Sequence, residues 1–123
     1  MEPAIIELHH VQLAMPAGRE EEARRFYSGV LGIPEIRKPA ALTKRGGVWF
    51  ETGNIRVHLG VEKDFRPARK AHPGLLVRDL KSLSVRLTEA GYEVTPGEPL
   101  EGYAHIYAND PFGNRLELLQ ATD

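Results

Sequence analysis

The chain has 123 residues, a length that fits one domain with a sizeable core, and it contains no cysteine. Disulfides and thiolate chemistry are therefore excluded, and any metal ion must be bound through nitrogen and oxygen atoms. The 16 basic and 17 acidic residues leave a formal net charge of −1, which gives no electrostatic reason to expect nucleic acid or an anionic membrane surface as a partner.

The N-terminal half reads as a strand, a helix and three further strands. It begins without the basic and apolar regions of a signal peptide, and no segment approaches the ~20 apolar residues of a membrane span, so we expect a cytoplasmic protein. Alternating apolar residues predict a strand over residues 5–15, and a helical stripe predicts a helix over residues 20–31 that ends at Gly32. Short strands are predicted near residues 35–37, 48–51 and 55–61.

A polar segment of about residues 62–71, interpreted as a solvated loop, links this half to a second one with the same order of elements. There, Asp79 is a candidate N-cap for a helix over residues 80–90, and residues 110–113 (DPFG) have the composition of a structural turn. Strands are predicted near residues 92–95, 104–108 and 115–119. We therefore predict a single domain over residues 1–123, with module one at about 5–61 and module two at about 72–120.

The two halves keep a nearly constant offset. His10 and His72 each stand at a strand start and lie 62 residues apart, and two Gly-Asn pairs precede matching strands 60 residues apart. In those strands His58 falls opposite Glu117, 59 residues away. Matches that keep one order and one offset indicate an internal duplication.

Four of these repeat-related residues are predicted to share a site. His10, His58, His72 and Glu117 each alternate with the apolar residues of their strands, which places them on the face away from the helices. If the modules pack about a pseudo-twofold axis, equivalent positions converge near it, so we expect the four side chains to surround one point. Three imidazoles and one carboxylate suit a divalent cation such as Zn, Ni, Fe, Co or Mn, and the sequence leaves its identity open.

The halves resemble the βαβββ modules of the vicinal oxygen chelate superfamily, which includes glyoxalase I, extradiol dioxygenases, methylmalonyl-CoA epimerase and the fosfomycin and bleomycin resistance proteins. The resemblance covers nearly the whole chain and is carried by HVQLAMP, FYSGVLGIPE, HPGLLVRDL and, most specifically, DPFGNRLELLQ. It implies an α+β fold in which two tandem βαβββ modules form a cupped mixed β-sheet with helices on the outer face. It also implies a homodimer.

The resemblance bears on the metal ligands as well. In the family they stand at the start of the first strand and within the last strand of each module, positions held here by His10, His58, His72 and Glu117. His58 stands where metal-dependent glyoxalase I usually has Glu, which puts ordinary methylglyoxal chemistry in doubt. His58 is thus a fourth ligand, a base or a neighbour of the metal.

The expected function is metal-dependent catalysis on a small oxygen-rich molecule, by a glyoxalase-type lyase or isomerase or, with iron, a dioxygenase. Glu117 or His58 would transfer protons. The alternative is a non-catalytic resistance protein that binds a drug or toxin, as bleomycin-sequestering relatives do. Further residues are candidates for contact with the small-molecule substrate. Arg56 and Arg115 would bind an anionic group, and Trp49 would form an apolar wall of the cleft. Tyr103, His105 and Tyr107 share one strand face that would line the cleft.

Overall fold

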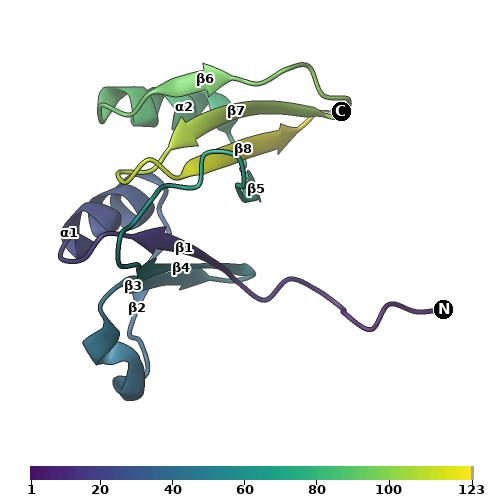
Figure 1. Cartoon of the computed structure of the whole chain (residues 1–123). Coiled ribbons are helices and arrows are strands. Elements are labelled where there is room, and N and C mark those ends of the chain that lie inside the picture. Colours follow the sequence, from purple (N-terminus) through teal and green to yellow (C-terminus); the bar gives the residue numbers. More distant parts are fainter. Residues whose placement is uncertain (123) are drawn as a thin grey trace.

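The computed structural model describes residues 1–122 and confirms an α+β fold of two βαβββ modules (Figure 1). The first module consists of β1 (Val11–Met15), α1 (Glu20–Ala23) continued by η1 (Arg24–Val30), β2 (Glu35–Ile36), the 3-10 helix η2 (Ala40–Arg45), β3 (Val48–Thr52) and β4 (Ile55–Val61). The second consists of β5 (Gly74–Leu76), α2 (Leu80–Glu89), β6 (Val94–Pro96), β7 (Tyr103–Asn109) and β8 (Arg115–Ala121). Within residues 1–122, no helix is both long and apolar enough to span a bilayer.

The strands of residues 1–122 form two four-stranded sheets, in the orders β1-β4-β3-β2 and β5-β8-β7-β6. In each sheet the first and last strands of the module pair in parallel, and the other pairs are antiparallel. The shared order and pairing pattern confirm the predicted repeat. The parallel pairing leaves β1 and β5 at the edges of their sheets.

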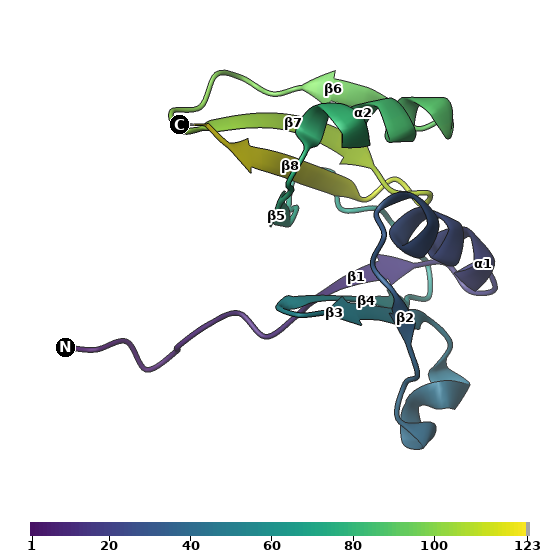
Figure 2. The same ribbon diagram turned by 180° about the vertical axis from the view of Figure 1, so that it is seen from behind.

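One apolar core joins the two modules. α1 lies between the levels of the two sheets, and α2 packs against the second sheet (Figure 2). The inward-facing residues of β1, β4 and β8 are buried in this core, as are Phe26 and Tyr27 of η1. Phe26 also packs edge-to-face on Tyr92, with ring centroids 4.7 Å apart, so the first helix contacts the second module directly.

The helix ends follow local sequence signals. Asp79 accepts a hydrogen bond from the backbone N–H of Ser82 at 3.0 Å, which confirms it as the N-cap of α2. Gly32 follows the first helical run with φ of +78°, a conformation that side chains with a Cβ rarely adopt. The predicted helix over residues 20–31 is one continuous run over 20–30, but its second part is a π-helix in which Leu31 N–H donates to Phe26 C=O.

The first strand is shorter than the predicted residues 5–15. β1 pairs with β4 only from Val11, which lies opposite Val57, and β4 itself begins at Ile55. The segment before β1 therefore extends beyond the end of the sheet, where no strand is available to pair with it. It projects from the body of the molecule and exposes Ile5 and Ile6, which are 81% and 93% exposed (Figure 1).

A buried hydrogen-bond network fixes the second module on the first. The Tyr27 hydroxyl donates to Asp110 Oδ2 at 2.6 Å, and Asn114 Nδ2 donates both to Asp110 and to the Ala14 carbonyl of β1, the latter at 2.8 Å. Asn114 Oδ1 in turn accepts from the backbone N–H of Ala68 in the linker. Asp110 Oδ1 accepts two backbone N–H groups within residues 110–114, as expected for a structural turn. This turn leads directly into β8 and so sets the position of Glu117.

Candidate functional site

The open face of the first sheet carries a stack of three rings. His58 lies opposite Trp49 in the antiparallel β3–β4 pair, and their rings are parallel with centroids 3.9 Å apart. The ring of His10 stacks on His58 at 4.6 Å. His58 Nε2 lies 2.7 Å from Glu51 Oε2, and the imidazole is only 4% exposed. A carboxylate and two rings thus fix the orientation of His58.

The matching face of the second sheet places Glu117 between two imidazoles. Glu117 Oε1 lies 3.1 Å from His72 Nε2, and Oε2 lies 2.7 Å from His105 Nδ1. The other nitrogen of each ring faces a backbone carbonyl: His72 Nδ1 that of Lys70, and His105 Nε2 that of Glu98. Because a carbonyl oxygen only accepts, these outer nitrogens carry the protons in the neutral tautomers, and their partners present lone pairs to the carboxylate. Each contact with Glu117 therefore requires a further proton or a cation.

The pKa of His105 is raised by this environment. The hydrogen bond to the Glu98 carbonyl is the largest cause, partial burial opposes it, and the Glu117 carboxylate adds to the rise. Gly97 lies directly over the imidazole, and a Cβ at that position would come within 2.4 Å of His105 Cε1. The strand β7 and this glycine together confine the ring beside Glu117.

Three of the remaining predicted substrate-contact residues differ in how far the protein itself occupies their polar groups. Arg56 donates to the His9 carbonyl at 3.1 Å and faces Glu51, so its guanidinium is occupied within the first sheet. The guanidinium of Arg115 lies over the ring of Tyr107 at 4.0 Å, and Tyr107 contacts both imidazoles that flank Glu117. Tyr103 stands at the start of β7 and is exposed.

The four predicted ligands come together as two pairs within the chain, His10 with His58 and His72 with Glu117. Each pair belongs to a different sheet. In residues 1–122, no group of three or more histidine, aspartate or glutamate side chains has an arrangement that could hold a metal ion. The predicted ligands of one chain therefore form two separate pairs, one on each sheet.

Sequence reasoning missed two polar residues on these faces. Glu51, the partner of His58, lies two residues after Trp49 in the same strand, and this spacing alone places both on one face. Arg69 belongs to the linker that was interpreted as a solvated loop, but it lines a cavity together with Arg115. No pattern in the linker marks Arg69, because its position depends on how the chain crosses to β5.

Comparison with known proteins relates this geometry to one superfamily. The sequence model of the Glyoxalase/Bleomycin resistance protein/Dioxygenase superfamily matches residues 7–118. A solved structure described as a glyoxalase family protein, from Bacillus anthracis, is 43% identical with a TM-score of 0.93 and covers 99% of this chain and 100% of its own. No curated protein sequence matches the chain.

More distant solved structures share the fold. The fosfomycin resistance protein FosX from Listeria monocytogenes is 17% identical with a TM-score of 0.75, and the match covers 96% of this chain and 95% of FosX. TnmS3, an antibiotic binding protein from Streptomyces sp. CB03234, is 20% identical with a TM-score of 0.73, and the match covers 98% of this chain and all of TnmS3. At these identities the likeness concerns the fold alone.

Proposed function

Because the chain belongs to the glyoxalase/bleomycin resistance protein/dioxygenase superfamily, we propose that it is a metal-dependent enzyme acting on a small oxygen-rich molecule. The observation that carries this proposal is the position of Glu117 between His72 and His105. The reaction is that of a glyoxalase-type lyase or isomerase, or that of a dioxygenase if the native metal is iron.

The pair formed by His72 and Glu117 has the chemistry of part of a divalent-cation site. With His72 Nδ1 donating to the Lys70 carbonyl, the neutral imidazole presents the lone pair of Nε2 next to Glu117 Oε1. Two electron-rich atoms in contact are stabilised by a positive charge placed beside both, and a nitrogen–oxygen pair suits Zn, Ni, Fe, Co or Mn. The carbonyl also fixes the imidazole, as outer hydrogen bonds do for metal-binding histidines in general. We propose His10, His58, His72 and Glu117 as the ligands.

The separation of the four proposed ligands into two pairs favours a site shared by two copies of the chain. His10 precedes β1 and His72 precedes β5, and both strands are sheet edges with unpaired backbone groups. We propose a homodimer in which the β1 edge of one copy lies beside the β5 edge of the other. A twofold axis then produces two equivalent sites, each with His10 and His58 from one copy and His72 and Glu117 from the other. The exposed apolar segment before β1 supports this assembly, since it would be covered there.

The chain's own groups would handle protons and substrate orientation. A bound divalent cation supplies a positive charge that polarises substrate oxygens and stabilises the negative charge that develops on them. Glu117 would accept a proton through Oε2, the oxygen that does not face His72, and His105 would hold that proton, because its ring is in contact with Oε2 and its pKa is raised. His58, oriented by Glu51, would be the corresponding base from the first module when it is released from the metal.

A second function, binding without catalysis, is favoured by the ring stack of the first sheet. Trp49 and His10 both stack on His58, and the outer ring face of such a stack suits a planar drug or toxin. The fold likeness to the antibiotic binding protein TnmS3 is consistent with this alternative.

Metal content separates the two functions. Protein purified without chelator is analysed for first-row metals, and the chelated protein is then titrated with each cation and assayed on diols and on adducts of α-ketoaldehydes with thiols. The enzyme proposal expects one tightly bound cation per chain and turnover that chelation abolishes. Absence of any metal affinity, with a planar ligand bound at Trp49, would instead establish the binding protein.

A further inference from the structure

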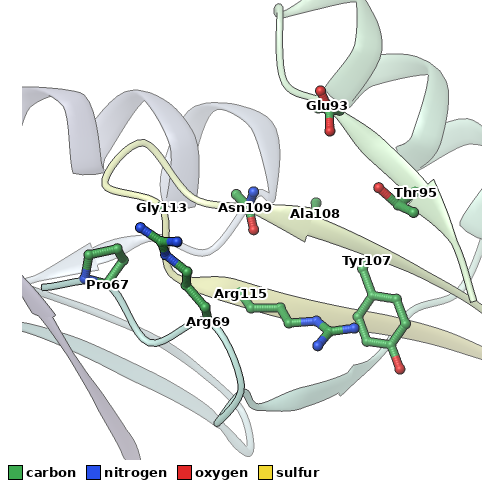
Figure 3. A pocket seen from close by; sticks show the side chains of 9 residues that line it. All are labelled: Pro67, Arg69, Glu93, Thr95, Tyr107, Ala108, Asn109, Gly113 and Arg115. Carbon is green, nitrogen blue, oxygen red and sulfur yellow. The ribbon is translucent and has the colours of Figure 1, made fainter.

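A cavity of about 540 Å³ lies on the second sheet, on the same face as Glu117 (Figure 3). The shared face follows from the strand register, because Tyr107 pairs with Glu117 and Asn109 pairs with Arg115 in the antiparallel β7–β8 pair. The residues that give the cavity its chemistry are polar or charged: Arg69, Glu93, Thr95, Tyr107, Asn109 and Arg115.

The charge of this cavity is predominantly positive. Arg69 and Arg115 line one side of it, and Glu93 and Thr95 stand on the opposite side, along β6 (Figure 3). Within residues 1–122, neither guanidinium forms an ion pair with a carboxylate. Arg115 Cζ lies over the Tyr107 ring, 4.0 Å from its centroid, and this contact holds the guanidinium in place while its N–H donors stay available.

The first module provides an internal comparison. Arg56 is the repeat equivalent of Arg115, and in the first sheet it lies opposite Glu51, whose carboxylate is 3.9 Å from Arg56 Nε. In the second sheet the residue opposite Arg115 is Asn109, which is neutral. The same architecture thus neutralises its arginine in one module and leaves it unpaired in the other.

We propose that this cavity binds an oxyanion group, carboxylate or phosphoryl, of a small organic acid. Arg115 and the linker residue Arg69 supply the charge, and the hydroxyl group of Thr95 supplies a further hydrogen bond. Arg115 stands two residues before Glu117 on the same strand face, so the rest of the bound molecule extends toward the carboxylate. The inference rests on the proposed function in one respect, that the ligand of this cavity is the substrate of the site at Glu117.

The test uses the full-length protein after chelator treatment, so that a metal ion cannot hold the anion. Inorganic phosphate and acetate are titrated separately against backbone amide resonances, with sodium chloride at matched ionic strength as the reference. Arg69→Gln and Arg115→Gln are each expected to weaken binding about tenfold or more, because each removes a charged donor. Arg66→Gln, in the same linker but outside this cavity, is the matched control and should change the affinity less than about twofold.

Asn109→Asp is the sharpest variant, because it recreates beside Arg115 the carboxylate that Glu51 places beside Arg56. It is expected to abolish anion binding without altering the fold. Stronger binding of phosphate than of acetate would identify a phosphoryl ligand, and the reverse a carboxylate ligand. The proposal is overturned if neither anion exceeds chloride, if Arg66→Gln costs as much as Arg115→Gln, or if Asn109→Asp binds normally. Metal titration of Arg115→Gln tests the proposed metal site separately, since that variant should bind the cation as the wild type does.

Discussion

His58 and Glu117 occupy equivalent positions in the two sheets. Each lies in the strand that pairs in parallel with the first strand of its module, and each faces an aromatic residue across the antiparallel pair, Trp49 or Tyr107. The imidazole is held by a carboxylate, Glu51, whereas the carboxylate is held by imidazoles. The same position of the repeat is therefore a histidine beside a carboxylate in the first module and a carboxylate beside histidines in the second.

A mixed-dimer experiment tests whether the metal site is shared. A variant with His10→Ala and His58→Ala and a variant with His72→Ala and Glu117→Gln should each lose metal affinity. In a denatured and refolded equal mixture, half of the dimers contain one copy of each, and such a dimer has one site with all four ligands. About a quarter of the wild-type metal content should therefore return. Should the mixture bind no more metal than the separate variants, the site lies within one chain.

Loss of His72 should weaken metal binding far more than loss of His9, a histidine that is not a proposed ligand. His9 is exposed, its ring lies beside the His10 ring, and its carbonyl accepts from Arg56. Competitive titration of His72→Ala and His9→Ala against a coloured chelator measures both affinities. In the wild type the affinity should fall as the pH is lowered, because protons and the cation compete for imidazole nitrogens. Equal losses in the two variants would contradict the ligand assignment.

The raised pKa of His105 predicts how its contribution to stability varies with pH. A group whose pKa is higher in the folded than in the unfolded state stabilises the fold below its unfolded pKa, and this stabilisation disappears as the pH rises through the folded pKa. The difference in unfolding free energy between wild type and His105→Asn should therefore be larger at about pH 5 than at about pH 9. Urea denaturation of the metal-free proteins measures it, and NMR should show the His105 ring titrating above ~6.5. A ring that titrates below that value would refute the arrangement around Glu98 and Glu117.

The buried hydroxyl of Tyr27 should contribute measurably to stability. Tyr27→Phe keeps the packed ring but leaves Asp110 Oδ2 without its donor from the first module, at an expected cost of about 1–3 kcal/mol. Tyr92→Phe is the matched control, because the structure shows no hydrogen bond of the Tyr92 hydroxyl to any group in residues 1–122. Equal changes in the urea midpoint for the two variants would show that the Tyr27–Asp110 bond adds nothing. Burial and the Asp110 carboxylate also raise the Tyr27 pKa, so this donor stays protonated.

Most of the fold could be predicted because its signals are local. Alternation indicated which residues of β4 and β8 face the core, Asp79 marked a helix start, and Gly32 marked a helix end. The near-constant offset between the halves was sufficient to predict the repeat, because it needs only the spacing of residues along the chain. The length of β1 could not be predicted, since residues 5–8 are mostly apolar, as in a strand, but lie past the end of β4.

The site was predicted less completely because it depends on distant contacts. Strand alternation placed His58 and Glu117 on the open faces, but it contains no information on whether two open faces of one chain meet. Glu51 could have been found by its spacing from Trp49. Arg69 could not, because its place beside Arg115 depends on the path of the linker. That path is fixed by backbone hydrogen bonds at Ala68, one to Asn114 Oδ1 and one from Arg115 N–H.

The Asn114 network has a consequence for how this chain can evolve. Its amide spans module one, the linker and the turn before β8, and Tyr27 of the first module supplies the proton that Asp110 of the second accepts. A module encoded by itself would expose Phe26 and leave Asp110 short of a donor. Although the two modules have the same strand order, each buries residues of the other. Recombination can therefore exchange the pair as a unit, whereas inheritance of a single half would yield a chain unable to complete its own core.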